Sequence, residues 1–151
     1  MLSLAAREAD IVGLNANMAA GVIDERAGAS ATVEATDEKL GWIRDAAGDR
    51  FEDIELQTRV HMSQITDDPI GLAELMAPAL GLDAEAALAS PHVLAGSTGQ
   101  CVETLLAWRE RWGLTYIGLN EDSMVEFGPV VEALSGVCAQ IQSPGYQSSS
   151  V

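Results

Sequence analysis

Apolar and polar residues alternate strictly along residues 54–62, IELQTRVHM. A period of two residues is typical of a β-strand with one apolar and one polar face. The polar face consists of Glu55, Gln57, Arg59 and His61. A strand buried on both sides rarely has such a face. The pattern therefore predicts either a strand that lines the wet interior of a barrel, with Glu55 and Arg59 paired, or a strand at a sheet edge.

Two short apolar runs, at residues 10–14 and 115–119, predict further strands. Residues 15–35 are rich in small residues and are predicted to form a long loop. Helical patterns are found at residues 2–9, 36–48, 69–80, 83–88, 97–113 and from 123 or 128 to about 134. Strands that alternate with helices predict an α/β fold with about three parallel strands and flanking helices.

Helix starts are marked by capping residues. Thr36 is predicted to cap the helix that follows it, and Ser97 with Gln100 forms the S-x-x-Q pattern of a capping box. For the last helix two starts fit the sequence equally well. It begins either at Ser123, which opens an S-x-x-E pattern, or at Gly128, which precedes a proline.

Length and charge limit the classes of function. A chain of 151 residues favours one domain, which we place at residues 1–136, followed by a disordered tail at 137–151. The net charge of −15 argues against a nucleic-acid or anionic membrane partner. The sequence has no apolar run of membrane-spanning length and no basic leader, so a cytoplasmic location is expected. Cys101 and Cys138 match no metal-ligand or redox spacing and are expected to be buried thiols.

Four segments together resemble the C-terminal part of the luciferase-like monooxygenase superfamily. They are LAAREADIVGLN, EKLGWIRDAAGDRFEDIELQTRV, SPHVLAGSTGQCVETLLAWRERWGLTYIGL and FGPVVEALSG. Within that superfamily the chain looks most like the oxidoreductases that use the deazaflavin coenzyme F-420. The resemblance covers residues 2 to about 136.

This resemblance implies a (β/α)₈ barrel, of which the chain would hold the last three strands with their helices. The family's glycine-rich turn and N-terminal strands, which carry most coenzyme contacts, would precede Met1. The implied activity is hydride transfer between a small-molecule substrate and coenzyme F-420, with FMN as the alternative coenzyme. The chain is expected to be inactive alone.

Half a barrel would expose two strand edges and one face of its core, which favours pairing with another chain. The expected partner is a separate N-terminal half or a second copy of the chain. The competing hypothesis is a non-catalytic α/β module that associates through this open edge.

Candidate site residues come from the barrel geometry, because active sites of such barrels lie at the C-terminal ends of the strands. Asn15 follows the first strand and is assigned to the coenzyme. His61 is the candidate acid or base, since histidine titrates near neutral pH. Arg59, Asn120 and Glu121 are assigned to the substrate side.

A second candidate site is the start of the helix at 97–113. Gly96, Ser97 and Thr98 precede it, and free backbone N–H groups at a helix start attract anions such as a coenzyme phosphate or acidic tail. A simpler interpretation is that Ser97 only caps its own helix.

Simpler interpretations exist for the other candidates as well. His61 could satisfy a partly buried polar site, and Asn15 and Asn120 could be turn residues. His92 is expected to be structural, and Trp108 and Trp112 to pack in the core. We find no metal-ligand cluster, P-loop or Ser-His-Asp pattern in the sequence.

Overall fold

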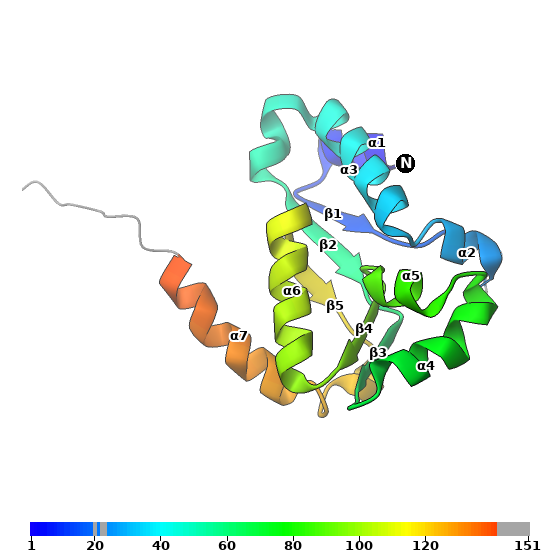
Figure 1. Cartoon of the computed structure of the whole chain (residues 1–151). Coiled ribbons are helices and arrows are strands. Elements are labelled where there is room, and N and C mark those ends of the chain that lie inside the picture. Colours follow the sequence, from blue (N-terminus) through cyan, green and yellow to red (C-terminus); the bar gives the residue numbers. More distant parts are fainter. Residues whose placement is uncertain (20, 22–23, 142–151) are drawn as a thin grey trace, which may run out of the picture.

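The computed structural model describes residues 1–19, 21 and 24–141 and shows a mixed α/β fold (Figure 1). The strands are β1 (Ile11–Leu14), β2 (Glu55–Arg59), β3 (Met62–Ile65), β4 (Val93–Gly96) and β5 (Leu114–Gly118). The α-helices are α1 (Leu2–Glu8), α2 (Glu25–Ala29), α3 (Val33–Ala47), α4 (Pro69–Met76), α5 (Ala84–Ala89), α6 (Thr98–Trp112) and α7 (Gly128–Ile141). Three short 3₁₀ helices are η1 (Gly48–Asp53), η2 (Ala77–Leu80) and η3 (Glu121–Ser123).

All strand pairs are parallel, as the alternation of strands and helices predicts. β2 lies at the centre of a three-stranded sheet, between β1 and β5, and β3 pairs with β4 in a second, two-stranded sheet. The described residues thus form five strands instead of three. The prediction missed β4, a four-residue strand between a Ser-Pro-His turn and the start of α6.

The predicted strand at residues 54–62 contains β2 and only the first residue of β3, so the rest of β3 was also missed. The Val60 N–H donates to the carbonyl of Gly118, the last residue of β5, whereas the His61 N–H donates to the carbonyl of His92, just before β4. The chain therefore leaves the first sheet after Val60 and joins the second. The side-chain alternation continues across this break, which is why the sequence pattern did not reveal it.

One face of the three-stranded sheet forms the hydrophobic core. Val12, Leu56 and Leu114 on this face are buried, and α3 and α6 supply apolar side chains to the same core. Trp108 and Trp112 are 5% and 3% exposed, which confirms the prediction that they pack in the core. Cys101 is also buried, as predicted, while the side chain of Cys138 lies outside the described part.

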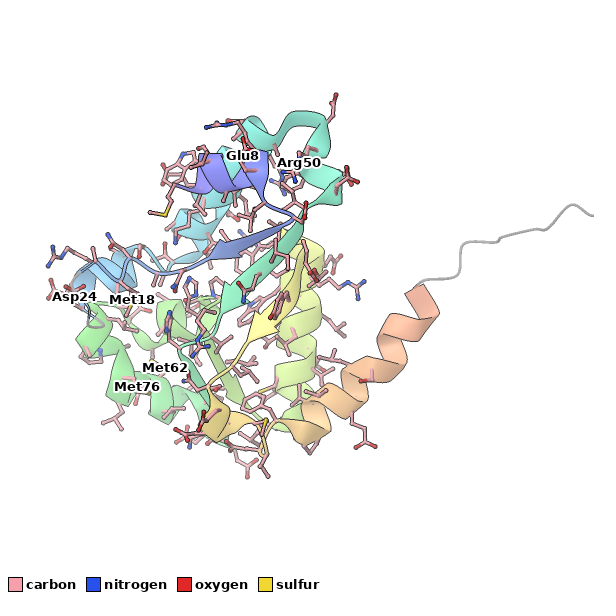
Figure 2. All side chains as sticks on the ribbon, turned by 180° about the vertical axis from the view of Figure 1, so that it is seen from behind. Glu8, Met18, Asp24, Arg50, Met62 and Met76 are labelled. Atoms are coloured by element: carbon pink, nitrogen blue, oxygen red, sulfur yellow. The ribbon has the colours of Figure 1, made fainter. Side chains whose placement is uncertain are left out.

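The opposite face of this sheet, which we call the bare face, is not covered by a described helix. In Figure 2 the strands β1, β2 and β5 face the viewer and α6 lies behind them. Ile11 and Tyr116 on the bare face are 47% and 45% exposed. Because β2 is central, the prediction that its polar face marks a sheet edge is wrong.

The predicted pairing of Glu55 with Arg59 is also wrong. No ion pair joins these two side chains in the described part of the chain. Instead, Arg59 donates a hydrogen bond to Asn120, which follows β5.

Helix α3 begins earlier than predicted. Its N-cap is Thr32, whose hydroxyl accepts the Ala35 N–H, whereas Thr36 is buried inside the helix and donates its own hydroxyl to the Thr32 carbonyl. The predicted loop at 15–35 also contains α2, capped by Asp24. Helix α2 was missed because it is only about one turn long. The start of α3 was misplaced because Thr32 and Thr36 are both suitable N-cap residues.

The last helix begins at Gly128, the second of the two predicted starts. It continues through Gly136 to Ile141, beyond the predicted end near residue 134. Residues 142–151 of the predicted tail lie outside the described residues. No helix in the described part of the chain is long and apolar enough to cross a membrane.

Candidate functional site

Four predicted site residues meet where β1, β2 and β5 end, and we call them the strand-end cluster: Asn15, Arg59, His61 and Asn120. The Arg59 guanidinium donates to Asn120 Oδ1 at 2.6 Å, and Asn120 Nδ2 donates to the His61 carbonyl at 3.1 Å. His61 Nε2 lies 2.7 Å from Asn15 Oδ1. Parallel strands end at the same edge of a sheet, so three strands deliver four polar side chains to one place.

The loop that carries Asn120 is held against β3. The hydroxyls of Ser63 and Ser123 are 2.7 Å apart, and the Glu126 carboxylate accepts the Ile65 N–H at 2.9 Å. The S-x-x-E pattern at Ser123, one of two predicted helix starts, therefore fixes this loop instead of capping a helix. Sequence reasoning missed this role because it depends on the position of β3.

The residue on the β1 side, Asn15, is held by Lys39 from α3. The ammonium of Lys39 donates to the Asn15 carbonyl at 2.8 Å and also to the Ser30 carbonyl. Lys39 is the only lysine of the chain, and burial lowers its pKa. It ties α3 and the end of α2 to the strand-end cluster.

The hydrogen bonds of Asn15 define the tautomer of His61. Asn15 Oδ1 also accepts the Ala16 N–H at 2.9 Å, which identifies this atom as the oxygen. His61 Nε2 must then carry the hydrogen, and Nδ1 has the lone pair. Within the described part of the chain, Nδ1 makes no hydrogen bond. Desolvation, and then the charge of Arg59, lowers the pKa of His61, so the ring is a neutral base at pH 7.

The other histidine, His92, is a buried neighbour of this cluster. It is 3% exposed, and its ring centroid lies 5.8 Å from that of His61. His92 Nδ1 lies 2.8 Å from the Arg59 carbonyl and donates to it, which fixes the end of β2. Its Nε2 is buried without a hydrogen-bond partner among the described residues. Burial lowers the pKa of His92 to about 4.

A pocket of about 270 Å³ opens beside the cluster, and we call it the His61 pocket. Its polar lining comes from His61, Ser63, Gln64, Asn120, Asp122 and Ser123. Its larger apolar side chains are Met62, Leu72, Met76, Leu88 and Val93. Met62 of β3 and Met76 of α4 lie close together in Figure 2, which marks the position of the pocket.

The remaining predicted site residues lie outside this cluster. Ser97 caps α6 as the simpler interpretation predicts, since the Gln100 side chain returns to the Ser97 N–H at 2.8 Å. None of Gly96, Ser97 and Thr98 lines the His61 pocket. Glu121 is exposed on η3. The structure thus does not join the predicted anion site to the strand-end cluster.

The His61 pocket does not accommodate a whole coenzyme. Pockets for drug-sized ligands measure roughly 300–1,000 Å³. Among the described lining residues there is neither a lysine nor an arginine to bind an acidic tail. The bare face is the better match for a flat ring with a polar edge, because it combines Tyr116 with Gln57 and Arg59. Gly13 and Gly118 flank the Gln57 side chain and leave room for it. Among the described residues, no group of three His, Cys, Asp or Glu side chains could hold a metal ion.

Comparisons with known proteins do not identify a family. No family model matches the chain, and no curated protein or solved structure is significantly similar to it. Its function must therefore be inferred from its residues and their geometry.

Proposed function

We propose that this chain is the C-terminal part of a (β/α)₈-barrel oxidoreductase similar to the luciferase-like monooxygenases, and that it forms the substrate side of the site. The observation that supports this is the strand-end cluster at the carboxyl ends of three parallel strands, because barrel enzymes place their sites there.

The bare face supports a barrel over a doubly wound sheet. A doubly wound sheet has helices on both faces, whereas barrel strands have helices only on the outside. In the described part of the chain, α3 and α6 pack on one face while Ile11 and Tyr116 are about half exposed on the other. Among the strands that the structure describes, β1 and β5 have one neighbour each, so both edges can accept further parallel strands.

Within such a site His61 is the residue suited to move a proton. Its neutral ring presents Nδ1 as the acceptor, while Asn15 fixes the tautomer and orientation of the ring. Arg59 and Asn120 hold the carbonyl of His61 in place. The coenzyme, deazaflavin F-420 or alternatively FMN, would supply the hydride chemistry when bound, and Tyr116, Gln57 and Arg59 are its expected contacts here.

The second candidate function is a non-catalytic module that pairs through its open sheet edges. The unpartnered edges of β1 and β5 and the bare face favour it. This function requires a defined complex but no coenzyme.

Coenzyme binding distinguishes the two functions. The full chain is titrated with F-420 and with FMN by fluorescence, after light scattering has defined its oligomeric state. Two exposed aromatic residues give a matched pair of variants, since Tyr116 on the bare face and Trp42 on α3 are 45% and 47% exposed. The proposal expects saturable binding that Tyr116→Ala weakens and Trp42→Ala leaves unchanged. The loss of one ring contact worth roughly 1.4 kcal/mol weakens binding about tenfold. A discrete oligomer that binds neither coenzyme contradicts the assignment of Tyr116, Gln57 and Arg59 as coenzyme contacts and supports the module.

A further inference from the structure

We propose that the His61 pocket binds a small organic cation, a protonated amine with an apolar body, whose charge is offset by the carboxylate of Asp122. The inference names the substrate class of the proposed site, and it rests on the proposed function only in taking this cation as the substrate. Two properties of the pocket support it. One wall is apolar, and Asp122 is the acidic residue among its described lining residues, none of which is a lysine or an arginine.

The apolar wall defines the body of the ligand. Met62, Leu72, Met76, Leu88 and Val93 line the pocket, which measures about 270 Å³. A dry cavity of roughly 150 Å³ is enough to bind benzene, so a six-membered ring with a short substituent fits here. Methionine sulfur makes favourable contacts with aromatic rings, so an aromatic body suits a wall that contains two methionines.

The charge of Asp122 defines the polar end of the ligand. In the described part of the chain, Asp122 makes neither a hydrogen bond nor one of the three ion pairs. A neutral ligand that covered this carboxylate would take water from it without compensation, and an anionic ligand would add repulsion. An ammonium group supplies the missing counter-charge. Because charges act over several ångströms, this argument depends on the sign of the lining charge and not on one hydrogen bond.

Arg59 and His61 are the groups whose positive charge would oppose a cation. Arg59 does not line the pocket itself and donates to Asn120, which does. The two residues after Asn120 are Glu121 and Asp122, so two carboxylates follow the residue that holds this one guanidinium. Desolvation, and then the charge of Arg59, lowers the pKa of His61, so its ring adds no charge at pH 7.

The uncharged polar groups of the pocket also accept hydrogen bonds from an ammonium. Gln64 lines the pocket and has no hydrogen-bond partner among the described residues, so its Oε1 is free to accept. The hydroxyls of Ser63 and Ser123 share one hydrogen bond and keep further lone pairs. A neutral alcohol could use these groups equally well. The charge at Asp122 is therefore the feature that selects a cation.

The test uses three probes with the same ring: benzylamine, which is protonated at pH 7, benzyl alcohol and benzoate. The full chain is labelled with ¹³C at its five methionine methyl groups and titrated at pH 7 without coenzyme. An aromatic probe shifts the signals of the methyl groups beside it, so Met62 and Met76 report on the pocket. Met124 is 71% exposed and does not line the pocket, so it serves as the internal control.

We expect benzylamine to shift the Met62 and Met76 signals saturably and to leave Met124 unchanged. It should bind about fivefold more tightly than benzyl alcohol, which is the effect of one exposed ion pair at the upper end of its range. Benzoate should bind more weakly than the alcohol. Raising the salt concentration from about 0.02 to about 0.2 M should weaken the binding of benzylamine and leave that of benzyl alcohol unchanged.

Two neighbouring residues give a matched pair of variants. Asp122→Asn and Glu121→Gln each remove one negative charge from η3, but only Asp122 lines the pocket. Asp122→Asn should abolish the preference for benzylamine over benzyl alcohol, and Glu121→Gln should keep most of it. Equal or tighter binding of benzyl alcohol or benzoate to the wild type, an equal loss of preference in both variants, or no shift with any probe would overturn the inference.

The outcome is separable from that of the proposed function. Benzylamine binding by a chain that binds neither F-420 nor FMN would support the ligand assignment while the oxidoreductase proposal failed. Coenzyme binding without any effect of benzylamine on Met62 and Met76 would overturn the ligand assignment alone.

Discussion

Lowering the pH from 7 to 5 is expected to destabilise the fold, and His92 should account for most of the loss. Burial of its neutral ring lowers the pKa of His92 from 6.5 to about 4 in the folded chain. The unfolded chain therefore binds more protons than the folded chain between these values, so the free energy of unfolding falls as the pH drops through this window. For a ring that is 3% exposed, linkage gives a loss of about 2 kcal/mol between pH 7 and pH 5.

The assay is urea unfolding followed by tryptophan fluorescence, at pH 7, 6 and 5. The control is His92→Asn, whose amide nitrogen can replace Nδ1 as the donor to the Arg59 carbonyl but does not titrate. His61, the only other histidine, also has a lowered pKa, so the same series on His61→Asn measures its share. An equal loss of stability between pH 7 and 5 in His92→Asn and in the wild type would refute the role of His92.

Three further predictions concern packing, capping and charge. Gly28→Ala should destabilise the chain by about 1–3 kcal/mol in urea unfolding, because the new Cβ would overlap the backbone carbonyl at the end of η2. Gly41 lies in open space within α3, so Gly41→Ala should stabilise the chain by about 0.5–1 kcal/mol. A stability change of the same sign for both variants would contradict the packing at Gly28. Ser97→Ala should lower the free energy of unfolding by about 1 kcal/mol, because α6 loses its N-cap. Coenzyme binding should not change. A change in the affinity for coenzyme would instead show that Ser97 belongs to the site. Arg59→Met should raise the pKa of His61 toward its ordinary value in an NMR titration, and an unchanged or lower pKa would show that the guanidinium does not act on the ring.

Local patterns predicted the parts of the fold that depend on neighbouring residues. The alternation at 54–62 identified which side chains of β2 are buried, and the Ser97–Gln100 pair located the start of α6. The sequence gives less information on short elements. β4 has only four residues and α2 only five, too few for a period to emerge above the surrounding Ala and Gly.

The candidate site was predictable in its residues but not in its contacts. The rule that strand ends converge was enough to select Asn15, His61 and Asn120. Which of them touch depends on strand order and register, and the sequence contains neither. Arg59 illustrates this, because its partner is Asn120, distant in sequence, and not Glu55 on its own strand. The pocket wall on α4 depends in the same way on where that helix packs.

Lys39 is a natural probe whose rate of chemical modification reports on local opening of the structure. It is the only lysine in the sequence, and its ammonium donates to the carbonyls of Asn15 and Ser30. Amine acylation requires a free, deprotonated amine, so apart from the terminal amino group the reagent can modify only a chain in which these bonds have opened. The rate of modification at Lys39 thus measures how often its side chain leaves the carbonyls of Asn15 and Ser30, beside His61, without any engineered label.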